Sequence, residues 1–333
     1  MKALVYLGPR RMELQDAPEP TPGAGEVVIR TGAAAICGSD LHGFREASPR
    51  RIPPLVMGHE AVGTVAAVGD GVDPARVDER VVLKPILACG VCERCRDGRT
   101  NLCTSGRLVG RDLTGAFAER FAIPASAAVP VADHVADDLA TLTEPLANAV
   151  HVASRAVGTG DNVLVIGAGP IGALMVRMAR RHGASQVFAT DPVATRLAIA
   201  EAQGATPLRP EDPEASRHEL TDGRGVDVVI DAAGFDATWA LALRAVRSGG
   251  RVEAVGLAAP EARINFFAVA DKEVVVTASY AWIDEDFARA LRLIEDGAID
   301  ASGWFTRMPL SDGQRAFEEL VDSTEHFKVV LTP

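Results

Sequence analysis

The stretch Asn162-Val163-Leu164-Val165-Ile166-Gly167-Ala168-Gly169-Pro170-Ile171-Gly172 decides the fold of the second half of the chain. Its first five residues predict a buried strand, and the glycines after them match the pattern G-x-G-x-x-G at the start of a predicted helix. Such glycines permit a tight turn and the close approach of a pyrophosphate to the N-terminus of the helix. A glycine turn needed only for packing is the alternative. The motif predicts a dinucleotide site formed by Gly167, Gly169, Pro170, Ile171 and Gly172.

An acidic residue follows at the end of the next predicted strand. Asp191 lies 19 residues after Gly172. A carboxylate there accepts hydrogen bonds from the adenosine ribose hydroxyls and repels a 2′-phosphate, which favours NAD over NADP. Arg196, in the helix after it, either packs on the adenine or is a solvated helix residue.

The pattern of predicted secondary structure changes twice along the chain. Strands and helices alternate from residue 147 to 280, which predicts a parallel sheet covered on both faces. Residues 1–146 show short β segments punctuated by Gly and Pro, which predicts an all-β domain. Residues 281–333 are too short to fold alone, so we expect them to return to the first domain. The fold class predicted is α/β plus β, with a doubly wound parallel sheet in the second domain.

Composition narrows the function. The 333 residues suffice for two domains, and 47% apolar with 24% charged residues is typical of a soluble protein. The net charge of −11 argues against nucleic acid or an anionic membrane as a partner. We find no signal peptide and no apolar run of membrane-spanning length. Five cysteines without a signal indicate a reducing cytoplasm.

Four of the cysteines form a cluster with the spacing C-x2-C-x2-C-x7-C. Disulfides are disfavoured without secretion. The ferredoxin pattern has a last gap of three residues followed by Pro, whereas here the gap is seven and Thr104 follows. The cluster predicts a closed structural zinc site that pins a lobe at about residues 86–106. Its ligands are Cys89, Cys92, Cys95 and Cys103.

The fifth cysteine belongs to a different set of residues. Cys37, His59, Glu60 and Glu144 offer a thiolate, an imidazole and carboxylates with no further cysteine nearby. Such a set is typical of an open, catalytic zinc site. Taken singly, Cys37 could be a buried structural cysteine and His59 a core histidine.

The neighbours of Cys37 favour the catalytic interpretation. Asp40 could orient the ring of His59 from behind. Ser39 and His42 add a hydroxyl and an imidazole two and five residues after the cysteine. Together they could begin a proton path from a metal-bound alcohol to solvent.

With these residues assembled, the chain resembles the zinc-dependent medium-chain dehydrogenases/reductases over essentially its whole length. The resemblance rests on four motifs in order, which are the Cys37–His42 element, the Gly58–Gly63 element with Val65 and Gly69, the four-cysteine lobe and the nucleotide fingerprint. It implies a GroES-like β domain interrupted by a Rossmann domain, with the active site in the cleft between them.

The resemblance also implies roles by position. Cys37 and His59 would be zinc ligands, Glu144 would occupy the third ligand position, and Glu60 would ligate zinc or exchange with water. Ser39 and His42 would relay the proton through the cofactor ribose. Five residues match the segments that flank the nicotinamide: Val255, Gly256, Leu257, Ser279 and Tyr280.

The expected reaction is the reversible oxidation of a secondary alcohol to a ketone, with two zinc ions per chain and NAD. Glutamate at position 144 indicates the polyol and threonine dehydrogenase branch, because ethanol-type enzymes carry cysteine there. Residues 144–151 look especially like threonine dehydrogenases, and the arginine that polyol enzymes often carry near Ala281 is absent. Phe117 and Trp282 would make the pocket partly aromatic.

Three functions therefore stay open. The first is a dehydrogenase of a polyol, sugar or cyclitol, and the second is a threonine-like amino-alcohol dehydrogenase. The third is a zinc-free nucleotide-binding relative without activity. The expected partners are a small-molecule alcohol and further copies of the chain, as a homodimer or homotetramer.

Overall fold

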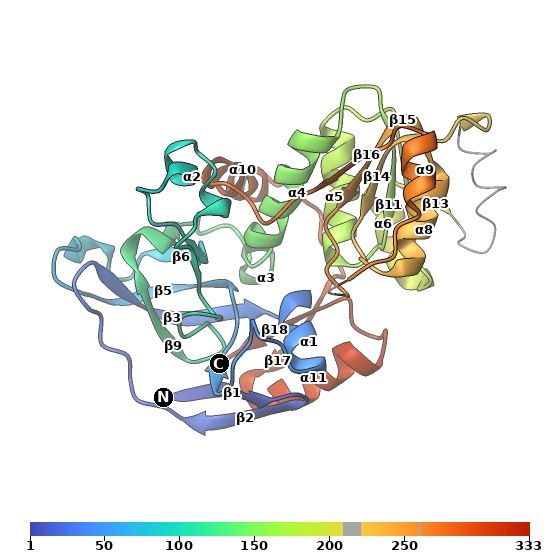
Figure 1. The fold of residues 1–333 in the computed structure, drawn as a ribbon. Helices are drawn as coiled ribbons and strands as arrows, with labels where there is room; N and C mark the ends of the chain where they lie inside the picture. Colours follow the sequence, from blue (N-terminus) through green and yellow to red (C-terminus); the bar gives the residue numbers. More distant parts are fainter. Residues whose placement is uncertain (209–220, 260) are drawn as a thin grey trace. The chain divides into compact units, whose positions relative to one another are not determined.

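The computed structural model describes residues 1–208, 221–259 and 261–333 and divides into two compact units (Figure 1). Unit 1 contains Met1–Ala147 and Ile283–Pro333, and unit 2 contains Asn148–Trp282. Each unit has its own sheet and its own hydrophobic core.

Unit 1 is built on a seven-stranded sheet in the order β10-β6-β5-β3-β18-β17, with β9 also paired to β3. Its strands are β3 (Glu26–Ala35), β5 (Glu60–Val68), β6 (Arg80–Leu83), β9 (Arg120–Pro124), β10 (Ala128–Pro130), β17 (Phe305–Pro309) and β18 (Lys328–Thr332). A three-stranded sheet adds β1 (Lys2–Gly8), β2 (Arg11–Asp16) and β4 (Leu55–Val56). A two-stranded ladder pairs β7 (Ile86–Leu87) with β8 (Arg107–Leu108).

Strand β3 organises this unit because three strands pair with it. It runs antiparallel to β5, β9 and β18, and in the last pairing Val330 lies opposite Ala35. The end of the chain is thereby fixed beside the residues that precede Cys37. Beneath the sheets, Phe317 packs against Phe44 and Phe117 with ring centroids 5.1 and 5.9 Å apart.

The helices of unit 1 are short at its N-terminal side and longer at its C-terminal side. They are α1 (Gly38–Arg45), α2 (Glu93–Arg96), α3 (Asp137–Ala140), α10 (Asp284–Glu295) and α11 (Gly313–Asp322), with the 3-10 turns η1 (Pro74–Arg76), η2 (Thr100–Leu102), η3 (Ala125–Ala127) and η4 (Leu310–Asp312). Helix α4 (Thr143–Ala156) begins in unit 1 and continues into unit 2.

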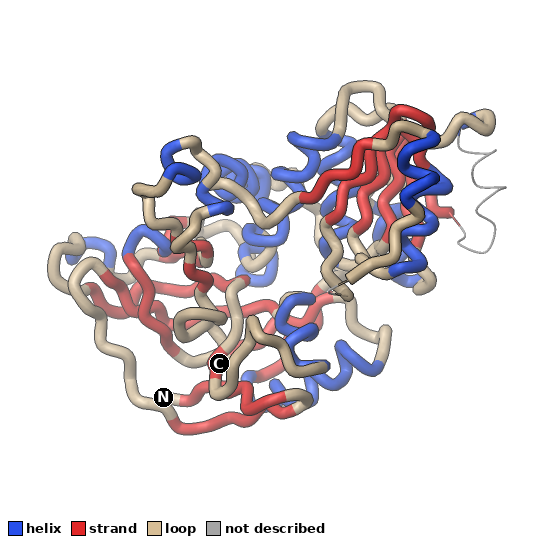
Figure 2. The backbone as a smooth tube through the Cα atoms, viewed as in Figure 1, coloured by secondary structure: helices blue, strands red, loops and turns tan. Residues whose placement is uncertain are grey.

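Unit 2 is a parallel six-stranded sheet in the order β13-β12-β11-β14-β15-β16, with helices on both faces (Figure 2). Its strands are β11 (Asn162–Ile166), β12 (Gln186–Thr190), β13 (Thr206–Leu208), β14 (Val226–Asp231), β15 (Val246–Ala254) and β16 (Val275–Ala278). Its helices include α5 (Pro170–Arg181), α6 (Ala194–Ala202), α8 (Asp236–Ala245) and α9 (Phe266–Asp271). This strand order is that of the doubly wound dinucleotide-binding fold, so the predicted fold class is confirmed.

The sequence located the strands of unit 2 better than the elements of unit 1. Strand β11 begins and ends at the predicted residues, Asn162 and Ile166. Helix α1 was missed because it spans only eight residues and contains Gly38 and Gly43, which have low helix propensity. Among the described residues, no helix has both the length and the apolar character that crossing a membrane requires.

Candidate functional site

The first cluster lies in unit 1 and joins Cys37 to two residues at the start of β5. Ligand atoms of Cys37, His59 and Glu60 lie within 4.8 Å of one another. Antiparallel pairing brings them together, because Ala35 near the end of β3 lies opposite Glu60. Gly58 has a φ of +97°, and a Cβ there would lie 2.7 Å from the ring of Phe117. Glycine is therefore required just before the histidine.

Asp40 lies behind this cluster and contacts two of its members. The carboxylate is completely buried, and its Oδ2 accepts a hydrogen bond of 3.3 Å from the backbone N–H of Cys37. Its Oδ1 lies 3.5 Å from Nδ1 of His59, an ion-pair distance without hydrogen-bond geometry. The contact leaves Nε2 of His59 as the nitrogen available to a metal.

The electrostatics of the cluster call for a cation. Burial lowers the pKa of His59, but the negative charges of Asp40 and Cys37 outweigh it and raise the pKa to about 10. The pKa of Lys328 is raised in the same way, because Glu60 and Cys37 outweigh the opposing effect of burial. Both basic groups therefore lie in a strongly negative environment.

The acidic groups and the donor atoms at this place favour a bound metal cation. Four groups are anionic when ionised: Cys37, Asp40, Glu60 and Glu144. Two of them form buried ion pairs with permanent cations, Asp40 with Arg51 and Glu60 with Lys328. A partly exposed cysteine, a buried imidazole and a buried carboxylate are donors that suit Zn²⁺. The residues present therefore fit the expected zinc.

Glu60 is shared between this cluster and Lys328. The two side chains form a buried ion pair, with Lys328 4% and Glu60 1% exposed. The ammonium also donates to the backbone carbonyl of Ile36 at 3.1 Å. Glu144 is buried near the start of α4, and its charge acts on both His59 and Lys328, but its carboxylate is outside the tight group. Its assignment as third ligand stays a prediction.

Ser39 and His42 lie on α1, three residues apart, so they share one face of the helix. Ser39 is exposed and His42 is partly exposed, with Nδ1 of the histidine 3.9 Å from a carboxylate oxygen of Glu46. Lys328 and Arg51 are buried at the cluster but are not among the residues predicted from the sequence. Lys328 could have been identified from the sequence, because it is a lysine directly before the apolar residues of strand β18.

We predict that Lys328→Met strongly destabilises unit 1, because it leaves the carboxylate of Glu60 buried without its partner. Breaking a buried pair usually costs about 3–5 kcal/mol in the free energy of unfolding. The double variant with Glu60→Gln should recover part of this loss, as measured by denaturant unfolding at equal zinc content. Lys2→Met, which breaks an exposed pair with Asp16, is the control and should cost less than about 1 kcal/mol. Equal losses in the single and double variants would contradict the pairing.

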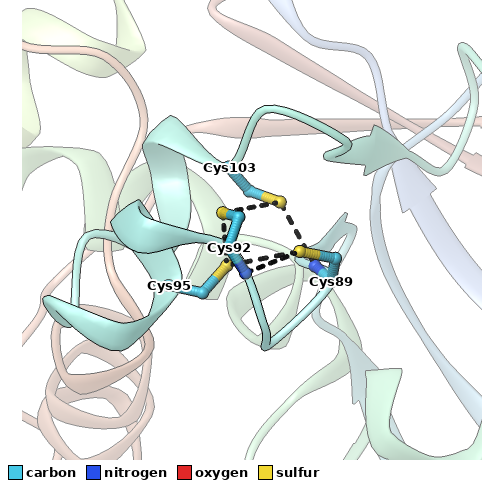
Figure 3. A group of neighbouring side chains, drawn as sticks. All are labelled: Cys89, Cys92, Cys95 and Cys103. Atoms are coloured by element: carbon cyan, nitrogen blue, oxygen red, sulfur yellow. Dashed lines mark hydrogen bonds between the residues drawn. The ribbon is translucent and has the colours of Figure 1, made fainter.

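The second cluster contains the other four cysteines, which converge from α2, the residues before it and the end of η2 (Figure 3). Sulfur–sulfur distances are 3.5 Å for Cys92–Cys95 and 3.9 Å for both Cys89–Cys95 and Cys92–Cys103. All five cysteines of the chain are free thiols. Four sulfurs each ~2.3 Å from a central zinc in a tetrahedron would stand ~3.8 Å apart. The cluster therefore fits a closed zinc site.

We predict that zinc binding by this lobe tightens as the pH rises from about 5 to about 8. Backbone N–H donors of Cys95 and Thr104 lower the pKa of Cys92 to about 6. Burial and hydrogen bonds with neighbouring thiols raise the pKa of Cys95 to about 12. Zinc must then displace the proton of Cys95 throughout this range, so a higher pH favours binding. Calorimetric titration of the metal-free protein in buffers of different ionisation enthalpy measures the released protons, and a pH-independent affinity would contradict this prediction.

The third site is the glycine loop between β11 and α5 in unit 2. Gly167 has a φ of +90°, and a Cβ on Gly172 would lie 1.8 Å from the carbonyl oxygen of Gly167. Gly169 caps the helix, Pro170 and Ile171 open it, and a Cβ on Gly169 would meet nothing within 4 Å. The open space at the helix N-terminus fits a pyrophosphate.

Asp191 holds the glycine loop by hydrogen bonds to backbone N–H groups. Its Oδ2 accepts a hydrogen bond from the backbone N–H of Ala168, and its Oδ1 accepts one from Val193, both at 2.8 Å. The carboxylate therefore holds the loop, and its remaining lone pairs can still accept ribose hydroxyls. Arg196 is partly exposed on α6.

The residues expected at the nicotinamide follow two neighbouring strands. Val255, Gly256 and Leu257 come after β15, and Ser279 and Tyr280 come after β16. The carboxyl ends of parallel strands lie at one edge of the sheet, so these five residues share the edge that carries the glycine loop. Leu257 is 67% and Tyr280 45% exposed.

The two expected pocket aromatics lie at buried positions. Phe117 is completely buried in the core of unit 1, and Trp282, in unit 2, is 1% exposed. Their roles in a substrate pocket stay predictions.

We predict that Gly172→Ala abolishes NAD binding while Gly169→Ala only weakens it. The methyl group at 172 would collide with the loop backbone, whereas the methyl group at 169 would occupy the space where a pyrophosphate oxygen is expected. Fluorescence titration of each variant with NADH measures the Kd, and circular dichroism checks the fold. Tighter binding by Gly172→Ala than by Gly169→Ala would contradict the geometry of the loop.

The fold and these sites define an oxidoreductase of the zinc-dependent, dinucleotide-binding type. A family model described as alcohol dehydrogenase GroES-like domain matches residues 23–133, and one described as zinc-binding dehydrogenase matches residues 170–296. The chain belongs to the zinc-dependent medium-chain dehydrogenase/reductase family.

Individual relatives span nearly the full length of both chains. An L-threonine 3-dehydrogenase from Shewanella baltica is 35% identical and covers 100% of this chain and 99% of its own length. An Escherichia coli oxidoreductase/dehydrogenase of unknown specificity is 30% identical with a TM-score of 0.92 and the same coverage. A structure described as a short chain alcohol dehydrogenase from Escherichia coli, complexed with NADH, is 29% identical with a TM-score of 0.91, again covering 100% and 99%.

Proposed function

We propose that the protein is an NAD-dependent dehydrogenase that interconverts a secondary alcohol and a ketone and holds two zinc ions per chain. One observation carries the proposal. The ligand atoms of Cys37, His59 and Glu60 gather within 4.8 Å of one another, and Ser39 follows two residues after the cysteine. A set of protein ligands with mixed S, N and O donors and no second thiolate is what a metal site with an open position uses.

The residues divide the work as follows. Cys37, His59 and one of the two glutamates Glu60 and Glu144 would hold a zinc that polarises the alcohol oxygen, and bound NAD would accept the hydride. Ser39 would accept the alcohol proton at Oγ while its own hydroxyl proton passes on through the cofactor ribose. His42, on the same face of α1 and partly exposed, releases a proton to solvent. Glu60 is oriented by Lys328, and the ring of His59 by Asp40.

The substrate class we propose is a polyol, sugar or cyclitol, supported by glutamate rather than cysteine at position 144. A threonine-like amino alcohol is the second candidate. It is favoured by the 35% identity, over the whole chain, to proteins described as L-threonine 3-dehydrogenase. A zinc-free relative without activity is a third possibility, and the intact ligand set argues against it.

NAD rather than NADP is supported by Asp191 at the end of β12, where a carboxylate repels a 2′-phosphate. One relative of 29% identity was solved with NADH and another of 28% identity with NADP, so the choice rests on Asp191.

The assembly we propose is a homodimer or homotetramer. Strand β16 is an edge of the sheet of unit 2, and Val275 and Val276 on it are 47% and 39% exposed. Phe266 and Phe267 on α9 are 76% and 82% exposed, so a second copy would cover much apolar surface. Free cysteines support a reducing cytoplasm as the location, and the net charge of −11 disfavours nucleic acid and anionic membranes as partners.

The proposal is tested by zinc content and turnover of chelator-free protein, using secondary alcohols, polyols, cyclitols and threonine with NAD and NADP. We expect two zinc ions per chain and a higher kcat/KM with NAD. Zinc near zero, or no turnover of any alcohol, would overturn the proposal. Turnover of threonine alone would select the second candidate.

Three substitutions distinguish residues needed for turnover from residues needed for stability. Cys37→Ser should abolish turnover and leave NAD binding intact, because unit 2 carries its own core. Cys92→Ser should mainly lower stability, because it opens the lobe. His42→Ala should reduce kcat by at most about 10²–10⁴-fold. Full activity in Cys37→Ser would remove the catalytic zinc from the mechanism.

A further inference from the structure

Arg51 is a buried arginine that touches the two residues next to the catalytic cluster. Its side chain is 5% exposed. Nη2 donates to Oγ of Ser39 at 3.1 Å and to Oδ1 of Asp40 at 2.9 Å, and Nη1 donates to the backbone carbonyl of Gly110 at 3.2 Å. We propose that Arg51 is a positioning residue for the dehydrogenase reaction, fixing the serine that takes the proton and the carboxylate that orients His59. This inference rests on the proposed function.

Two features that accommodate the Arg51 side chain lower the stability of the folded protein. A Cβ on Gly43 would lie 2.6 Å from Cγ of Arg51, so α1 carries a glycine at a helical position where glycine costs stability. The Nε of Arg51 is buried and has no hydrogen-bond partner, which is also unfavourable. A surface ion pair could tie the segment before β4 to α1 without either cost. The costs therefore suggest that the position serves the site.

The contact with Ser39 sets the direction of its hydroxyl. A serine hydroxyl has one proton to donate and two lone pairs that accept. A guanidinium donates only, so it occupies one lone pair and turns the serine proton away from itself. One acceptor position and one donor position remain. A relay needs this pair, the first to receive the alcohol proton and the second to pass a proton on.

The contact with Asp40 fixes the histidine ligand. Oδ1 of Asp40 is shared by Arg51 at 2.9 Å and by Nδ1 of His59 at 3.5 Å, while Oδ2 holds the N–H of Cys37. Without Arg51 the carboxylate loses its strongest contact and can rotate away from the ring. Partners behind a metal ligand of this kind usually change metal affinity by about 10–100-fold.

The test uses Arg51→Ala, with Arg50→Ala as the matched control, because Arg50 is exposed and adjacent in the chain. For Arg51→Ala we expect kcat to fall about 10²-fold, as for a misplaced reacting group. KM for the alcohol and the Kd of NADH should change little. Added guanidinium ion should restore part of kcat, which a general loss of stability would not allow. Arg50→Ala should behave as the unmodified protein in all assays.

Zinc affinity gives a readout independent of turnover. In competition with a chromophoric chelator, the catalytic zinc of Arg51→Ala should be held about 10–100-fold more weakly. Arg51→Lys keeps the charge without the fork of donors, so it should fold even if the alanine variant does not. We expect it to show a smaller loss of zinc affinity and a clear loss of kcat.

A double variant shows whether Arg51 acts through Ser39. In the Ser39→Ala background, replacing Arg51 by lysine should reduce kcat little further. Additive losses, or unchanged kcat and zinc affinity in Arg51→Ala, would overturn the proposal. If the unmodified protein oxidises no alcohol, the proposed function fails, and the zinc competition still decides whether Arg51 supports His59 through Asp40.

Discussion

The buried negative charge around Cys37 is the constraint on which unit 1 depends. The carboxylates of Asp40, Glu60 and Glu144 are buried around the partly exposed Cys37. Charges in such a place are tolerated only when they are paired. Arg51 pairs with Asp40 and Lys328 pairs with Glu60, and a zinc ion held by Cys37 and His59 would add further positive charge. The acids that make the site reactive also make the folded state dependent on what pairs with them.

The sheet of unit 1 brings these partners together from distant parts of the sequence. Strand β3 leads to Cys37, β5 begins with Glu60, and β18 begins with Lys328. Because β3 pairs with both other strands, one strand fixes the positions of the thiolate, the carboxylate and the ammonium. The ligands of the four-cysteine lobe, by contrast, are close in sequence, so a short loop is enough to bring them together.

This difference explains what could be predicted from the sequence. The glycine loop, the cysteine lobe and the strands of unit 2 are local patterns, and local spacing identified them. Lys328 and Arg51 are single residues that belong to no motif. Lys328 contacts Glu60, which lies 268 residues away in the chain. Arg51 packs against Gly43, where a larger residue would collide with its side chain. The assignment of Glu144 came from resemblance, whereas the structure groups Glu60 more tightly with the cysteine and the histidine.

The insertion of unit 2 into unit 1 has a consequence for biosynthesis. A ribosome makes Cys37 and His59 first, then all of Asn148–Trp282, and only afterwards Lys328. The inserted unit is contiguous and can fold as it emerges, as domains generally do during synthesis. Glu60 of the surrounding unit meets Lys328 only when the returning strand closes a loop of more than two hundred residues. Metal loading of the nascent chain would therefore be favoured late, after the last strand has docked.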